Sequence, residues 1–189
     1  MPQFTRISLM LALGVVAAAC SSQAPPAQST TASGVSAERG KYIVSIAGCH
    51  DCHTPLKMGP NGPEPDMSRA LSGHPESEKI DKAPTLPEPW MGVMSRTGTA
   101  WSGPWGISYT ANLTPDRNVG LGIWTEDMFM RAIREGKHMG TSRPILPPMP
   151  WQVYRNMTDE DLKSVFAYLQ TLTPIANRVP DAVITDPGK

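Results

Sequence analysis

The sequence contains a Cys-x-x-Cys-His pentapeptide at residues 49–53. Two thiols at this spacing can each add to a vinyl group of the same porphyrin, and the histidine that follows can then ligate the iron. A redox dithiol belongs in a βαβ pattern, and a tetrahedral zinc site needs further ligands, which the third cysteine, far upstream, does not supply. The motif therefore predicts a single covalent haem c, with Cys49 and Cys52 as thioether residues and His53 as an axial ligand.

The second axial ligand decides the function, because methionine favours reduced iron and suits electron carriers. Met149 is the strongest candidate, since the prolines at 147, 148 and 150 restrict its backbone and hold it extended. Other methionines fit gap-filling or exposed roles better; these are Met91, Met94, Met128, Met130, Met139 and Met157. His138 and His74 are alternatives in hydrophilic stretches, where histidines are usually solvated, and an open site is a further alternative.

The amino-terminal residues have the pattern of an export signal. Arg6 precedes an apolar run that is too short to cross a bilayer, and small residues follow it. The sequence AAAC at 17–20 resembles the lipobox of bacterial lipoproteins, which predicts a signal peptide over residues 1–19 and a lipidated Cys20. Several acyl chains would anchor the protein stably in a membrane. An ordinary cleavage site that leaves a free thiol is the alternative.

Composition divides the remainder of the chain. Residues 20–36 are uncharged and rich in Ser, Ala, Pro and Thr, which predicts a flexible tether. Residues 37–181 suit one domain, and residues 182–189 are expected to form a tail. The formal net charge is +0, and no basic patch indicates nucleic-acid binding.

Three helices are predicted, and the fold class is expected to be all-α, with few helices and long loops around one haem. The first helix spans 37–48, the second begins after Thr125 and stops at Gly136, and the third begins after Thr158. The 20 prolines and 16 glycines favour long loops. The segment 56–105 has no convincing period, and its conformation is left open.

Several motifs occur in the order found in class I-type cytochrome c domains. They are residues 48–54 (GCHDCHT), 111–116 (ANLTPD), 120–125 (GLGIWT), 147–151 (PPMPW), 157–162 (MTDEDL) and 167–169 (AYL). Together they resemble most the cytochrome subunits of bacterial membrane-bound alcohol, aldehyde and gluconate dehydrogenases. Those subunits generally carry several haems, whereas this chain has one attachment motif.

The resemblance implies the same thioether residues, with His53 and Met149 as axial ligands. It also implies that the first and last helices cross, with Gly40 allowing a close approach and Tyr168 packing there. Further candidates for the pocket wall, or for hydrogen bonds to the propionates, are Asn112, Thr114 and Trp151, for which loop shaping is the alternative role.

The expected function is electron transfer and not enzymatic catalysis. Single electrons would pass between redox partner proteins, such as a membrane-bound dehydrogenase or a terminal oxidase, through small transient interfaces. The protein would be lipid-anchored on the periplasmic side of a bacterial membrane, with no small-molecule substrate. The alternatives are a peroxidase-like haem enzyme or a haem-based gas or redox sensor, each with an open distal site.

Overall fold

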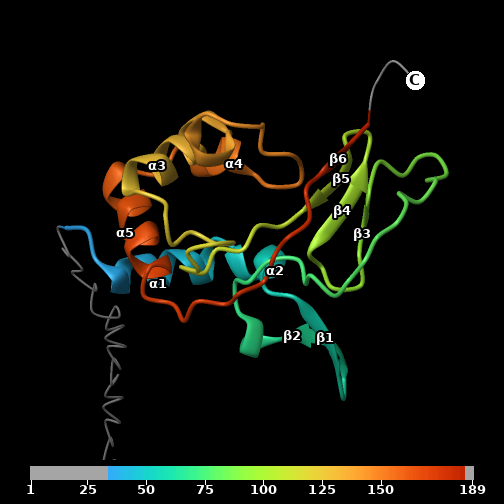
Figure 1. Ribbon diagram of the computed structural model, residues 1–189, viewed down its shortest axis with the longest axis horizontal. Helices are drawn as coiled ribbons and strands as arrows, with labels where there is room; N and C mark the ends of the chain where they lie inside the picture. Colours follow the sequence, from blue (N-terminus) through green and yellow to red (C-terminus); the bar gives the residue numbers. More distant parts are fainter. Residues whose placement is uncertain (1–33, 186–189) are drawn as a thin grey trace, which may run out of the picture. The chain divides into compact units, whose positions relative to one another are not determined.

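A computed structural model describes residues 34–185 of the chain (Figure 1). The predicted signal peptide over residues 1–19 and the predicted lipidation site at Cys20 lie outside the described residues. The helices are α1 (Ala37–Ile46), α2 (Cys49–His53), α3 (Glu126–Glu135), α4 (Trp151–Tyr154) and α5 (Asp159–Leu169), with 3₁₀ turns η1 (Met67–Arg69) and η2 (His138–Gly140). The strands are β1 (Leu56–Gly59), β2 (Gly62–Pro65), β3 (Val93–Met94), β4 (Ala100–Gly103), β5 (Gly106–Tyr109) and β6 (Val183–Ile184).

The prediction of an all-α fold was wrong, because the described residues contain two antiparallel sheets. One is the β1–β2 hairpin, and the other has the order β3-β4-β5-β6. Most of these strands come from the Pro- and Gly-rich segment 56–105, in which every strand has four residues or fewer. Strands this short give no measurable alternation of polar and apolar residues, so the sequence pattern did not reveal them.

The three predicted helices are confirmed, although α1 ends at Ile46 and not at residue 48, and the caps of α3 and the start of α5 are the predicted ones. The Thr125 hydroxyl accepts a hydrogen bond from the Met128 N–H at 3.2 Å, and Gly136 ends α3 in the left-handed region with φ of 68°. The Thr158 hydroxyl accepts a hydrogen bond from the Asp161 N–H at 3.1 Å and begins α5.

Helices α1 and α5 pack closely, as the resemblance implied. Gly40 on α1 is buried, and a Cβ atom at this position would collide with the backbone carbonyl of Ser164 on α5 and approach the Cβ of Tyr168. The Ser36 N–H also donates to the Ser164 hydroxyl at 3.1 Å. Glycine therefore sets the distance between these two helices.

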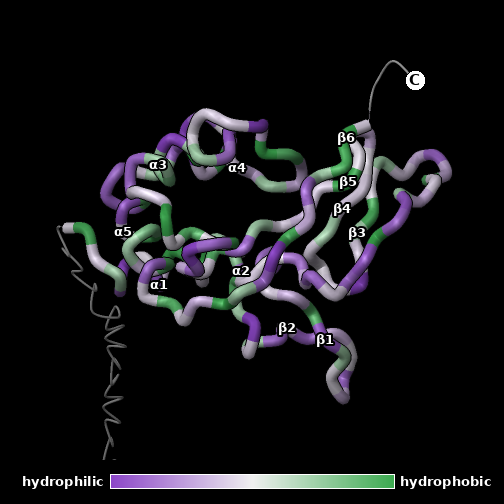
Figure 2. Tube along the Cα trace, in the orientation of Figure 1, coloured by the Kyte–Doolittle hydropathy of each residue, from purple (hydrophilic) through white to green (hydrophobic). Residues whose placement is uncertain are grey.

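The buried hydrophobic core is shared by α1, α3 and α5 and by two residues of the intervening loops. Its members are Ile43, Val44, Leu71, Leu121, Phe129, Ile133, Leu162, Val165, Phe166 and Leu169. Figure 2 shows further hydrophobic residues on β5 and β6 and in the loop before α4. None of the helices within residues 34–185 is long and apolar enough to cross a membrane.

Candidate functional site

A cavity of about 620 Å³ opens among the helices and β5. Ligand pockets commonly have volumes of about 300–1,000 Å³, so this one can take a large organic group. Apolar side chains dominate its wall, including Val44, Leu121 and Leu169. Cys49, Cys52, His53 and Met149 all line it, so the structure places every predicted haem residue among the described residues at one cavity.

Helix α2 carries the two cysteines on one face. Gly48 separates α1 from α2 in the left-handed region, with φ of 70°, which favours glycine at this turn. Residues three positions apart lie on the same side of a helix, and Cys49 and Cys52 both line the cavity. Burial raises the pKa of the Cys49 thiol to about 11 and also raises that of Cys52, which keeps both thiols neutral at pH 7.

His53 is fixed by a hydrogen bond from its ring. The imidazole is 7% exposed, and its Nδ1 atom lies 2.8 Å from the carbonyl oxygen of Ala111. Because a carbonyl can only accept, Nδ1 must carry the proton, and the neutral ring then keeps its lone pair on Nε2. A histidine that ligates a metal usually has this arrangement. Burial lowers the pKa of His53, which favours the neutral ring.

Met149 is half-buried and packs against the hydrophobic core. The loop that carries it is tied to the sheet, because the Ser108 hydroxyl on β5 donates to the carbonyl of Pro147. A second methionine, Met157, also lines the cavity and packs against the core. The sequence pattern favoured Met149 over Met157, whereas the structure has both thioethers at this wall.

The expectation that the alternative histidines are solvated was wrong for His74. His74 is fully buried; its Nε2–H donates to the carbonyl of Glu78, and its Nδ1 accepts from the Thr99 hydroxyl. It does not line the cavity of the predicted haem residues. His138 does line it, half-buried, with its ring edge-on to Trp124 at 5.1 Å between centroids.

Asn112 and Thr114 are engaged in shaping the loop that contains them. The Asn112 amide donates to the carbonyls of Ile175 and Asn177, and its oxygen accepts from the backbone N–H and hydroxyl of Thr114. Trp151 does not line the cavity and packs over Gly136 instead. Asn112 also lines the cavity, so its predicted place in the pocket wall is confirmed, whereas Thr114 and Trp151 do not line it and the structure favours the loop-shaping alternative for Thr114.

The cavity also has a polar rim, of which sequence reasoning named only His138, as an alternative ligand. It consists of His138, Ser142, Arg143, Arg178 and Asp181. Its members come from the loop after α3 and from the segment before β6, neither of which has a sequence period. No sequence period could show that these two segments line the same cavity.

No protein-family model matches the chain. The chain is 29% identical over 143 residues to a nicotinate dehydrogenase subunit of Pseudomonas putida, covering 76% of this chain and 9% of the relative. It is 30% identical over 151 residues to the fructose dehydrogenase cytochrome subunit of Gluconobacter japonicus, covering 79% and 24%. The gluconate 2-dehydrogenase cytochrome c subunit of Pantoea cypripedii is 33% identical over 91 residues, covering 48% and 20%.

The chain spans about a quarter or less of the length of these relatives. Cytochrome subunits of bacterial dehydrogenases recur among the proteins similar to this chain, which supports a cytochrome c-like family. This agrees with the resemblance found from the motifs.

Proposed function

We propose that the chain carries one haem c in the cavity, bonded through Cys49 and Cys52, and that it transfers single electrons. The observation that supports this most directly is the position of both cysteines, His53 and Met149 on the wall of one apolar cavity. A haem held there would supply a ferric–ferrous couple. The cytochrome subunits among the relatives support the same function.

In this proposal His53 and Met149 are the two axial ligands. The hydrogen bond to Ala111 orients His53 with Nε2 available, and the Ser108–Pro147 hydrogen bond holds the methionine loop against the sheet. Two protein ligands leave no coordination position for a substrate. The protein therefore acts as an electron carrier and not as a catalyst.

The lining of the cavity suits a porphyrin. Core residues from three helices present aliphatic and aromatic surface, and the polar side chains of the lining cluster at the polar rim and along the segment after β5. A low-polarity wall excludes water from the ring and so favours the less charged, ferrous state. The chain thus tunes the reduction potential through burial as well as through its ligands.

We further propose that Cys20 is lipidated, that residues 20–36 tether the domain, and that the protein works on the periplasmic side of a bacterial membrane. The AAAC pattern and the uncharged tether support this proposal. Redox partners would be membrane-bound, with a dehydrogenase as the first candidate because dehydrogenase subunits dominate the relatives. A terminal oxidase is the corresponding candidate acceptor.

Covalent attachment is tested by producing the protein with a c-type haem maturation system and separating it on a denaturing gel. We expect the wild-type band to retain haem and the Cys49→Ala/Cys52→Ala variant to lose it. The Met149→Leu variant is the control, because it changes the cavity wall and leaves both thioether residues intact. Haem that acidified acetone extracts from the wild-type protein would overturn the proposal of covalent attachment.

The ligand pair is tested by the absorption spectrum of the purified protein. A weak sulfur-to-iron band at the red end of the ferric spectrum, without a carbon monoxide adduct on reduction, is the expected result. Immediate binding of carbon monoxide would show an open site and favour an enzyme or a sensor.

A further inference from the structure

The polar rim carries the cationic side chains of the cavity. Among the described residues that line it, Arg143 and Arg178 are the arginines, no lysine is present, and Asp181 is the acidic residue. Both guanidinium groups are on exposed residues, and within residues 34–185 neither lies within ion-pair distance of a carboxylate. Two cations at the mouth of an apolar cavity suit an anionic group on the molecule that fills it.

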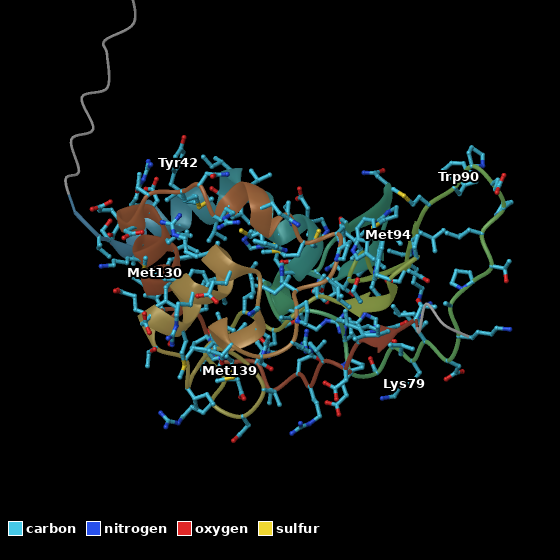
Figure 3. The ribbon with its side chains drawn as sticks, turned by 90° about the horizontal axis from the view of Figure 1, so that it is seen from above. Tyr42, Lys79, Trp90, Met94, Met130 and Met139 are labelled. Carbon is cyan, nitrogen blue, oxygen red and sulfur yellow. The ribbon has the colours of Figure 1, made fainter. Side chains whose placement is uncertain are left out.

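The polar rim and the cysteines belong to different segments of the cavity lining, and each segment is held by its own hydrogen bond. Near the cysteines, the Tyr154 hydroxyl donates to the Ala47 carbonyl at 2.6 Å and ties α4 to the turn before Cys49. In the polar rim, the His138 N–H donates to the Arg143 carbonyl at 2.9 Å. Figure 3 shows Met139, the neighbour of His138, on the opposite side of the domain from Tyr42 of α1.

Two charged members of the polar rim, Arg143 and Asp181, act on His138. Burial lowers the pKa of His138, the positive charge of Arg143 lowers it further, and the carboxylate of Asp181 raises it. Charges of residues 143 and 181 that act on one imidazole must be near it. The loop after α3 and the segment before β6 therefore form one charged edge.

The segment that carries Arg178 is firmly held. The Asn177 amide donates to the carbonyls of Ser72 and His74 at 2.7 and 2.8 Å, and its oxygen accepts from the Glu76 N–H at 2.9 Å. The position of Arg178 is thus fixed by the backbone next to it. Only the side chain of Arg178 would have to change its rotamer to contact a bound group.

The chemistry of haem separates its anionic groups from its attachment points. Protohaem has its two vinyl groups on one half of the ring and its two propionates on the other half. If the vinyl half is bonded to Cys49 and Cys52, the propionates point away from α2, and the guanidinium groups of the cavity lining that could bind them are those of Arg143 and Arg178. Asn112 and Thr114 cannot serve them as donors, because their polar hydrogens are already used within the protein.

We propose that Arg143 and Arg178 bind the propionates of the haem and act as positioning residues for the edge opposite the thioether bonds. This inference rests on the proposed function. A guanidinium group binds a carboxylate through two parallel hydrogen bonds and keeps its charge at any ordinary pH. Its positive charge also favours the ferrous state, so the two arginines raise the reduction potential.

The test measures the reduction potential and the resonance Raman bending mode of the propionates in Arg143→Gln, Arg178→Gln and the double variant. We expect the equilibrium to shift toward ferric haem about threefold in each single variant and about tenfold in the double variant, where tenfold corresponds to about 59 mV for one electron. The Raman mode should shift as its hydrogen bonds are lost. The Arg143→Lys and Arg178→Lys variants should have reduction potentials close to the wild-type value, because the positive charge is retained. The Asp181→Asn variant should have a higher reduction potential.

The matched control is Lys82→Gln, which removes one positive charge from an exposed residue outside the cavity lining. If the double variant matches this control in potential and Raman mode while its haem stays covalently bound, the proposed role of the arginines is wrong. A wild-type protein without covalent haem would instead contradict the proposed function.

Discussion

The Nδ1 atom of His53 donates a hydrogen bond to the carbonyl oxygen of Ala111 at 2.8 Å, across 58 positions of the chain. Ala111 follows β5, whose end is held by the Thr110 N–H donating to the Thr99 carbonyl at 2.9 Å. The sheet that the sequence failed to predict therefore orients the histidine that the sequence did predict. The orientation of the His53 ring therefore depends on the β4–β5 hairpin.

Met149→Leu and Met157→Leu separate the two thioethers that line the cavity. We expect the Met149 variant to bind carbon monoxide when reduced and its potential to fall by more than about 59 mV, because a soft donor that favours ferrous iron is lost. The measurement is a redox titration combined with carbon monoxide difference spectra.

The Met157→Leu variant is the control, since leucine replaces its packing volume at nearly equal size. We expect its potential to stay close to the wild-type value and its reduced form to exclude carbon monoxide. The reverse pattern would assign the iron ligand to Met157. A His138→Ala variant, which also alters the wall, should behave like the Met157 control.

The features predicted correctly from the sequence are those determined by residues close together in the chain. The attachment motif lies within five residues, and the capping residues Thr125 and Thr158 act within one helical turn, so sequence alone located both helix starts. The two-residue strand β6 exists only through pairing with β5, far away in the chain, and the two-residue strand β3 is too short to show a period. The polar rim joins two segments that no local pattern connects, so the sequence did not reveal it.

The burial of the alternative histidine His74 was also not predictable from the sequence. A histidine in a polar stretch is usually solvated, yet His74 is enclosed because the loop around it is fixed by distant residues such as Thr99 and Asn177. Hydrophilic sequence on either side gave no sign of that enclosure. Burial here is a property of the tertiary structure.

Gly40→Ala tests the contact between α1 and α5. Alanine at an exposed helical position would stabilise the protein by up to about 1 kcal/mol through helix propensity. Here we expect a net loss of about 1–3 kcal/mol, because the added methyl group collides with the Ser164 carbonyl and forces the helices apart. Chemical denaturation measures the change, with Lys41→Ala on the exposed face of α1 as the control. Equal or greater stability in the Gly40 variant would contradict the close packing.

His74→Gln tests the contribution of a buried neutral histidine to the pH dependence of stability. Burial lowers the pKa of His74 in the folded state, and the hydrogen bond to the Glu78 carbonyl only partly offsets it. As the pH falls below about 6.5, His74 of the unfolded chain binds a proton before His74 of the folded protein does. The contribution of His74 to the free energy of unfolding is therefore constant above that pH and declines below it. The limiting slope is about 1.4 kcal/mol per pH unit.

The measurement compares unfolding free energies between about pH 7.5 and 5.5. We expect a smaller decline in the His74→Gln variant than in the wild type, although the variant is less stable at every pH. The half-buried His50 is the comparison, and His50→Gln should change the slope less. Parallel curves for the wild type and the His74 variant would show that His74 does not contribute.

Cys20→Ser tests the proposed lipid anchor, which lies outside the described residues. We expect the wild-type protein to sediment with membranes and the variant to appear in the soluble fraction, because the variant lacks the thiol that carries the lipid. Haem content is the internal control, since Cys49 and Cys52 are unchanged. Unaltered fractionation, with full haem content, would count against lipidation at Cys20.

Asn177→Ala tests how the segment before β6 is held over the cavity. The side chain joins this segment to residues 72–76 through hydrogen bonds to Ser72, His74 and Glu76. Its removal leaves those backbone groups without their partner, and we expect a loss of about 2–3 kcal/mol in unfolding free energy.

Hydrogen exchange adds the local test for Asn177→Ala. The amide protection of β5 should fall where it pairs with β6, at Gly106 and Ile107, because the strand that covers it is no longer held. The control is Asn156→Ala, whose side chain bonds only to carbonyls three and four positions earlier and is exposed. If both variants lose the same stability and β5 stays protected, β6 is held by strand pairing alone. A fall in protection specific to Asn177→Ala would instead show that this one amide holds the segment before β6 against β5.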